Sequence, residues 1–154
     1  MASVDTTSKI NKNEYRALLD IAKEFGKEHA EEFIDKCIKN KNIVYDTSGN
    51  VTSIDMSGLH LHGSLSSSLG QLIHLIKLDL SNNSISGHIP LQLGDMTSLR
   101  SLDISSNELA ENIPPSIGKL VKLEILDLSK NKVHHYHHYH YYCYYHHHHH
   151  HSAE

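Results

Sequence analysis

The chain has 154 residues and a net charge of −4 with its histidines neutral, and acidic and basic side chains interleave along its length. This length allows one domain with a modest core, and without a basic stripe nucleic acid is not expected as a partner. The two cysteines, Cys37 and Cys143, are too far apart in the sequence to form a CxxC metal site or indicate a disulfide framework. This cysteine content favours a reducing compartment.

Residues 1–13 are mostly polar, and we expect them to be disordered. They lack the apolar core of a signal peptide, and no later stretch is apolar for long enough to span a bilayer. The chain as written is therefore expected to stay in the cytoplasm and to have no membrane span.

The next region, residues 14–48, has an amphipathic helical pattern over residues 14–39. Apolar side chains such as Leu18, Phe25 and Ile34 recur at spacings of three and four, and lysine and glutamate fill the other face. Gly26 is expected to divide this region into two helices or to kink one. We interpret the region as an N-terminal cap over the segment that follows; an independent helical hairpin is the alternative.

One phrase then occurs three times with a period of 24 residues: LIKLDLSNN at 75–83, LRSLDISSN at 99–107 and LEILDLSKN at 123–131. A less regular unit in the same frame precedes them, so residues 49–133 hold about three and a half units. A fixed period of this size indicates a solenoid, in which each unit buries its apolar face against its neighbours.

Each copy predicts a short strand followed by a turn. The alternation in Leu-Asp-Leu is typical of a strand buried on one side, and stacking the units places these strands in a parallel sheet. Asn83, Asn107 and Asn131 fall at the turn that leaves the strand, where a buried amide can serve backbone groups. We interpret these residues as a structural asparagine ladder. The first unit has Leu59 at this position, because no earlier repeat unit precedes it for an asparagine side chain to bond.

The second half of each unit is expected to return the chain along the convex side. Pro90 and Pro114 restrict the backbone there, and Gly94 and Gly118 are expected to allow a tight return before the next strand.

These motifs resemble the plant-type leucine-rich repeat, LxxLxxLxLxxNxLxGxIPxxLGx, which residues 72–95 match almost position by position. The resemblance implies an α/β leucine-rich-repeat solenoid with a helical N-terminal cap. It is typical of receptor-like kinase ectodomains, receptor-like proteins and polygalacturonase-inhibitor-like proteins, which bind peptides or proteins outside the cell. The chain has Tyr45 where that family has a cysteine, and it has no tryptophan. An extracellular or cell-surface location is the alternative if the chain is a fragment of such a protein.

The candidate ligand-binding residues alternate with the inward leucines and face the concave side of the solenoid. They form an acidic, hydroxyl-rich stripe that favours a basic or hydrogen-bonding peptide; alternatively, the Asp and Ser residues serve only the fold. The stripe consists of Lys77, Asp79, Ser81, Ser101, Asp103, Ser105, Ile125 and Asp127.

No catalytic set and no cofactor motif is found: no serine lies in a GxSxG turn, and there is no Gly-rich phosphate loop or HExxH helix. The sequence therefore predicts a non-enzymatic module that binds a protein or peptide. The alternative is a truncated fragment of a leucine-rich-repeat receptor-like kinase or receptor-like protein involved in cell-surface signalling.

Residues 134–154 form a low-complexity tail of mainly histidine and tyrosine. A translated simple repeat, a shifted reading frame, an unselected natural tail and a functional metal-binding tract are the readings that remain open. Weak nickel or zinc binding is expected from the histidine run His146, His147, His148, His149, His150 and His151. Since nothing in this tail resembles a polar cap, self-association through the last repeat is also predicted.

Overall fold

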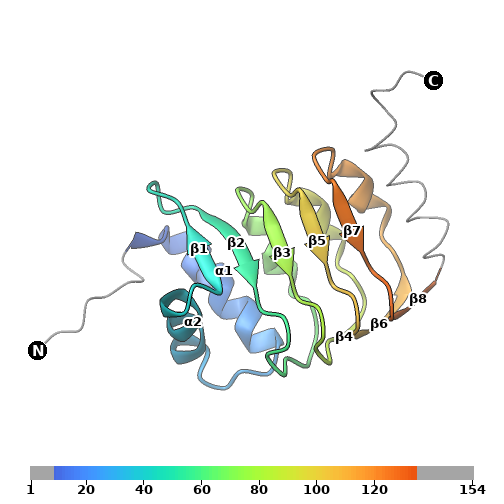
Figure 1. Cartoon of the computed structure of the whole chain (residues 1–154), viewed down its shortest axis with the longest axis horizontal. Coiled ribbons are helices and arrows are strands. Elements are labelled where there is room, and N and C mark those ends of the chain that lie inside the picture. The colour runs from blue at the N-terminus through green and yellow to red at the C-terminus, as the bar shows by residue number, and fades with distance from the viewer. Residues whose placement is uncertain (1–8, 135–154) are drawn as a thin grey trace, which may run out of the picture.

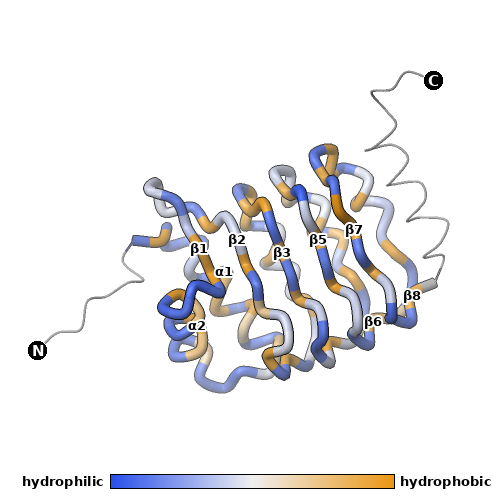
Figure 2. The backbone as a smooth tube through the Cα atoms, viewed as in Figure 1, coloured by the Kyte–Doolittle hydropathy of each residue, from blue (hydrophilic) through white to orange (hydrophobic). Residues whose placement is uncertain are grey.

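The computed structural model describes residues 9–134, which form a short solenoid with two helices at its N-terminal end (Figure 1). Along each turn of the solenoid, hydrophobic and hydrophilic segments alternate (Figure 2). The predicted leucine-rich-repeat solenoid with a helical N-terminal region is confirmed.

Helices α1 (Lys12–Glu24) and α2 (Ala30–Lys39) correspond to the amphipathic region. The chain breaks between them at Gly26, whose φ of 84° lies in the left-handed region that glycine adopts without a steric penalty. Leu18 and Phe25 are fully buried, as the spacing of apolar residues predicts.

The C-terminal end of α1 is bonded directly to the first repeat unit. The Glu24 carbonyl accepts a hydrogen bond from the Ser64 backbone N–H at 3.0 Å, and the Glu24 carboxylate accepts one from the Ser64 hydroxyl at 3.0 Å. α1 also packs on η2 (Ser67–Gln71), the first 3₁₀ turn of the solenoid. The buried residues of both helices and all repeat units form one continuous core.

One face of the solenoid is a five-stranded sheet in the order β1-β2-β3-β5-β7 (Figure 1). β1 pairs with β2 in the antiparallel direction, and the remaining pairs are parallel. The inward leucines of the central strands, Leu78 and Leu102, are fully buried. The strands are β1 (Ile43–Tyr45), β2 (Val51–Asp55), β3 (Lys77–Asp79), β5 (Ser101–Asp103) and β7 (Ile125–Asp127).

A second, parallel sheet lies along the returning half of the units and was not anticipated from the sequence. It consists of β4 (Ser86–Gly87), β6 (Glu108–Asn112) and β8 (Lys132–His134). Two further 3₁₀ turns, η3 (Leu91–Asp95) and η4 (Pro115–Lys119), follow β4 and β6 in the chain. The returning half of a unit is therefore more regular than the predicted turn.

The asparagine side chains bond each unit to the one before it. The Asn83 side-chain oxygen accepts hydrogen bonds from the backbone N–H groups of Leu59 and Leu61, at 3.1 and 2.9 Å. Its amide nitrogen donates to three carbonyls, including that of Met56 at 3.0 Å. Asn107 and Asn131 repeat this arrangement one and two units later. Leu59, at the ladder position of the first unit, thus donates its backbone N–H to the asparagine of the next unit.

Directly before each ladder position the backbone is left-handed. The φ angles are 63° at Gly58, 58° at Asn82, 55° at Ser106 and 57° at Lys130. Glycine adopts this conformation freely and asparagine tolerates it, whereas other residues are destabilised there. The last two copies therefore carry local strain that the first two avoid.

Gly94 and Gly118 lie in the 3₁₀ turns η3 and η4, and neither residue has a positive φ. At Gly94 the requirement is space: a Cβ would collide with the carbonyl oxygen of Ser116 in the next unit. Gly94 therefore lets neighbouring units approach closely.

Candidate binding face

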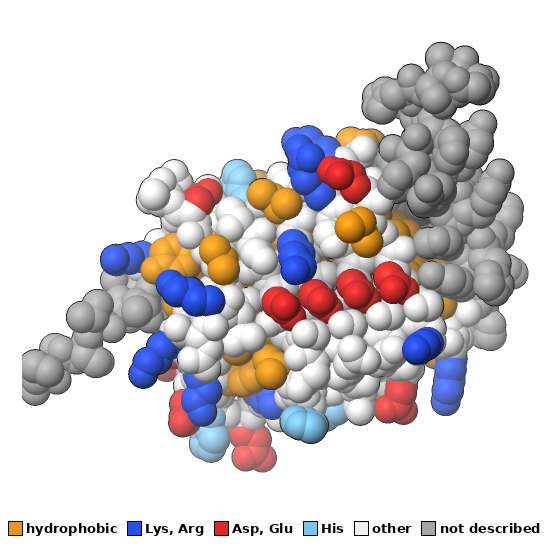
Figure 3. Space-filling view, viewed as in Figure 1, with side chains coloured by type: hydrophobic (Ala, Val, Ile, Leu, Met, Phe, Trp, Pro, Cys, Tyr) orange, Lys and Arg blue, Asp and Glu red, His pale blue; other side chains and the backbone are white. Residues whose placement is uncertain are grey.

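The parallel strands bring the predicted candidate residues into straight rows. Lys77, Ser101 and Ile125 are direct register partners across β3, β5 and β7. Asp79, Asp103 and Asp127 form the next row, which Asp55 extends onto β2. Neighbouring strands lie about 4.8 Å apart. The aligned aspartates form an unbroken acidic row across the sheet (Figure 3).

Each aspartate in this row holds the turn that follows its own strand. In Asp79 the Oδ1 atom accepts hydrogen bonds from the Ser81 hydroxyl at 2.6 Å and the Ser81 backbone N–H at 3.0 Å. Asp103 binds Ser105 in the same way, at 2.6 and 3.0 Å. Ser81 is only 6% exposed. These contacts support a structural role for the Asp and Ser residues, and burial removes Ser81 from a ligand's reach.

The row next to the aspartates differs from strand to strand. Lys77 is exposed, Ser101 is half-buried and Ile125 is 59% exposed. Since the fold imposes no common residue type here, these three positions are free to determine what the face recognises.

One further row was missed by the sequence analysis. We call Lys77, Ser101 and Ile125 the variable row. The residue directly before each of them also recurs at intervals of 24: Ile76, Arg100 and Glu124. Ile76 is 43% exposed, and the Arg100 guanidinium bonds the Glu124 carboxylate at 2.9 Å. Comparison of the repeat units at the position before Lys77, Ser101 and Ile125 would have identified these three residues from the sequence. Because this ion pair is exposed, it stabilises the fold little.

Metal binding has no support in the part of the chain that the structure describes. Residues 9–134 contain no group of three or more His, Cys, Asp or Glu side chains that could hold a metal ion. The predicted metal ligands at 146–151 lie outside the described residues. Among the described helices, none has the length and apolarity needed to cross a membrane.

Cys37 is a buried free thiol in α2. Burial raises the pKa of this thiol to about 11, and the nearby Lys27 and Lys36 oppose the rise only partly. Tyr45, at the position of the family's second cysteine, lies half-buried on β1 against the core. The helical region is therefore held to the solenoid by packing of its side chains, and Cys37 stays in its unreactive, protonated form.

Comparison with known proteins matches two repeat models to this chain. A model of two Leucine Rich repeats matches residues 97–134, and a single Leucine Rich Repeat model matches residues 74–96. No curated protein sequence matches the chain.

Some solved plant structures match the repeats, and others match most of the chain. The LRR ectodomain of the receptor kinase SOBIR1 from Arabidopsis thaliana is 28% identical over 81% of this chain and 70% of its own, with a TM-score of 0.70. PEPR1–AtPEP1 is 39% identical over 60% of this chain and 13% of its own, with a TM-score of 0.58. The BIR3–SERK2 complex from Arabidopsis thaliana is 33% identical over 63% of this chain and 53% of its own, with a TM-score of 0.58.

These matches agree with the leucine-rich-repeat solenoid and its helical N-terminal region. The chain spans only about an eighth of the PEPR1 chain and about half of the BIR3–SERK2 match, so it corresponds to one part of those proteins. Residues 74–134 are leucine-rich repeats, and the chain resembles plant receptor-kinase LRR ectodomains over most of its length.

Proposed function

We propose that the chain is a non-enzymatic module that binds a protein or peptide on the concave face of its five-stranded sheet. The observation that carries this proposal is the variable row Lys77, Ser101 and Ile125, which lies in register beside the aspartate row that the fold itself uses. Leucine-rich-repeat folds are typically binding modules, and the similar structures include PEPR1–AtPEP1 and the BIR3–SERK2 complex. A similar role for this chain is our inference.

The charge on this face supports a basic ligand. One carboxylate oxygen of each row aspartate is used by the following serine, as at Asp79 and Asp103, and no described residue bonds the other oxygen. Parallel pairing holds these carboxylates at a spacing close to that of adjacent strands. Ile125 adds an exposed apolar surface beside the acidic row. The expected ligand is an extended segment with a basic side chain next to an apolar one.

The proposal can be tested with an array of 12-residue peptides that vary in charge and hydropathy. The test variant combines Asp103→Asn, Asp127→Asn and Ile125→Ser, because asparagine removes the charge while its oxygen can still accept the serine hydrogen bonds. We expect the array to select basic peptides and the variant to bind them at least about tenfold more weakly, as for loss of charged and apolar interface contacts.

A matched control neutralises exposed acids far from this face: Glu28→Gln, Glu31→Gln and Glu32→Gln near α2. The control should keep full affinity for the selected peptides. Selection of peptides without regard to charge, or equal affinity in the concave variant, would contradict the proposal.

We also propose an extracellular or cell-surface location, the alternative raised by the family resemblance. The similar SOBIR1 and BIR2 structures are of ectodomains, whereas nothing in these comparisons supports the cytoplasmic expectation. The state of Cys37 is compatible with an oxidising compartment, because a buried thiol with a raised pKa resists oxidation. Detection of the native protein in the apoplastic fluid of the source tissue would support this location, and its confinement to the cytosol would refute it.

A fragment of a receptor-like gene remains the second candidate, and the partial coverage of PEPR1 and of the BIR3–SERK2 match favours it. Genomic sequence that continues with leucine repeats in another frame after codon 133 would support the fragment. Stop codons in all frames would argue for the chain as an independent module.

Self-association is proposed through β7, the last strand of the inner sheet in the described residues. Leu126 on this strand is only partly buried, and strand edges of this kind pair with other chains. Sedimentation velocity should show a concentration-dependent dimer that Leu126→Lys abolishes; a monomer at all concentrations would exclude it.

A further inference from the structure

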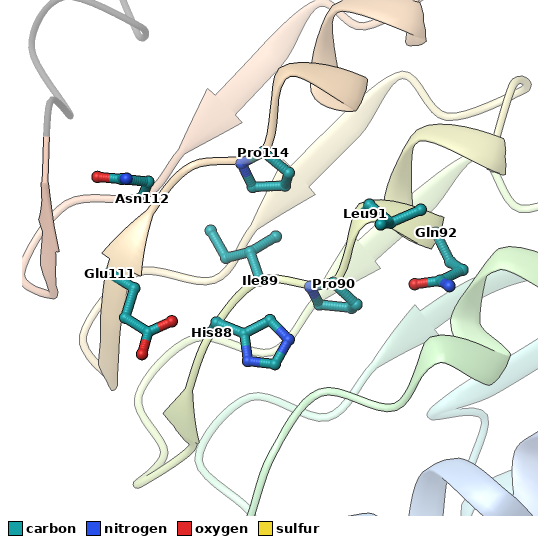
Figure 4. A pocket seen from close by; sticks show the side chains of 8 residues that line it. All are labelled: His88, Ile89, Pro90, Leu91, Gln92, Glu111, Asn112 and Pro114. Atoms are coloured by element: carbon teal, nitrogen blue, oxygen red, sulfur yellow. The ribbon is translucent and has the colours of Figure 1, made fainter.

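A pocket opens on the returning side of the solenoid, away from the concave face. Its volume is about 660 Å³, and it lies where the β4–η3 connection of one unit meets β6 and the start of η4 in the next (Figure 4). Its lining comes from consecutive units: His88, Ile89, Pro90, Leu91 and Gln92 from one, and Glu111, Asn112 and Pro114 from the other.

Glu111 stands at a backbone position that favours glycine. Its φ is 68°, and the residues 24 and 48 positions earlier are Gly87 and Gly63, with φ values of 80° and 72°. A non-glycine residue in this conformation is destabilised, and strain of this kind clusters at functional sites. The strained residue places a carboxylate at the rim of the pocket, where the equivalent glycines place no side chain.

The pocket lining departs from the repeat at several positions. Residues that the fold requires recur every 24 positions, as the ladder asparagines do. In the preceding unit the matching surface is small and uncharged: Ser64, Ser67 and Gly87 stand where the pocket has His88, Leu91 and Glu111. The fold therefore does not account for the chemistry of this pocket.

The lining combines an apolar surface with one fixed charge. Leu91 is 64% exposed beside Pro90, and Pro114 is half-buried on the opposite wall. Among the described residues that line the pocket, Glu111 alone is charged with histidine counted as neutral, and none is lysine or arginine. Its side chain extends from β6 toward the ring of His88 (Figure 4).

We propose that this pocket binds an arginine side chain of a partner protein, flanked by an aliphatic residue. The arginine stem would lie on the exposed Leu91 side chain while its guanidinium bonds the Glu111 carboxylate, since long basic side chains bury their stems and keep their charge at the rim. This second site is independent of the concave face.

The test is an NMR titration of the ¹⁵N-labelled protein with the probe acetyl-Leu-Arg-amide, compared with acetyl-Leu-citrulline-amide, which has the same shape without the charge. We expect shifted amides at 88, 89, 91, 92 and 111–113 and an affinity about two- to fivefold higher for the arginine probe, as for an exposed ion pair. Glu111→Gln should equalise the two probes, whereas Glu124→Gln, an exposed acid elsewhere, should not.

A second variant separates binding from folding. Glu111→Gly restores the residue that the repeat favours, so it should raise Tm while removing the preference for arginine. The concave-face variant Asp103→Asn should leave the titration unchanged, so failure here is distinguishable from failure of the concave site. Equal affinity of both probes for the unaltered protein, absence of binding, or shifted amides confined to β3, β5 and β7 would overturn the proposal.

Discussion

Leu102 and Leu126 occupy the same position in consecutive copies of the repeat, yet their surroundings differ. Leu102, on β5, is fully buried between β3 and β7. Leu126, on β7, is only partly buried, because no further strand follows β7 among the described residues. The comparison teaches that a unit is stabilised by its neighbours more than by its own sequence.

The N-terminal end of the stack is covered by residues outside the repeat. Glu14 on α1 is 7% exposed, and its carboxylate accepts a hydrogen bond from the Val51 backbone N–H at 2.7 Å. Tyr15 joins the two helices by donating to the Asp35 carboxylate at 2.9 Å. Closing an end of the solenoid thus takes a polar partner for the first strand as well as apolar cover.

The largest expected effect is the loss of stability when the buried leucine of the interior strand is truncated. Leu102→Ala should lower the free energy of unfolding by about 2–5 kcal/mol, because it leaves a cavity in a fully packed layer. Leu126→Ala should cost about half as much or less, since its side chain is already partly in water. Urea unfolding followed by far-UV circular dichroism measures both values. Equal losses would show that the last unit is covered as well as the interior ones.

The next effect concerns the asparagine ladder. Asn107, 8% exposed, bonds the Ile85 backbone N–H and three carbonyls, so Asn107→Ala should cost about 1–3 kcal/mol by leaving buried polar groups unpaired. Asn131→Ala should cost less, because Asn131 is half-buried and water can replace its bonds. The same urea experiment applies. A larger loss at Asn131 than at Asn107 would contradict this explanation.

A smaller effect concerns the backbone strain that the late repeat units carry and the early ones avoid. Lys130→Asn places at the strained position the residue that Asn82 already provides two units earlier, so stability should rise by about 0.5–1 kcal/mol. Lys132→Asn removes the same charge at an exposed position on β8 and serves as the control. Thermal unfolding should show a higher Tm for the first variant alone; a matching rise in the control would assign the gain to charge.

The last effect depends on pH and concerns the thiol of Cys37 at the covered end. Its pKa is raised from 9.0 to about 11 in the folded chain, so the folded state holds the proton more tightly than the unfolded state. Between these values only the unfolded thiol ionises, and stability should fall as pH rises from about 9 to 11. In a Cys143→Ser background, Cys37→Ala should show a shallower loss of stability over this interval. Parallel pH profiles would mean that the thiol is not held protonated by the fold.

The sequence was most informative where a residue's role depends on its own unit. The inward leucines, the ladder asparagines and the helix break at Gly26 all follow from local periodicity and residue type, and the structure agrees with each. The candidate face could be placed on the concave side for the same reason. Its aspartates could not be assigned a role, since the bond from Asp79 to Ser81 depends on turn geometry.

The sequence by itself determined the period, the solenoid and the residues that each strand turns inward, because these depend on patterns within one repeat. Only the tertiary structure decided how neighbouring units meet. It showed the second sheet, the close approach at Gly94, the burial of Ser81 and the strain at Glu111. The physical reason is that each of these features depends on backbone conformation or on atoms brought together from different turns. The periodicity of the sequence specifies neither the conformation nor these contacts.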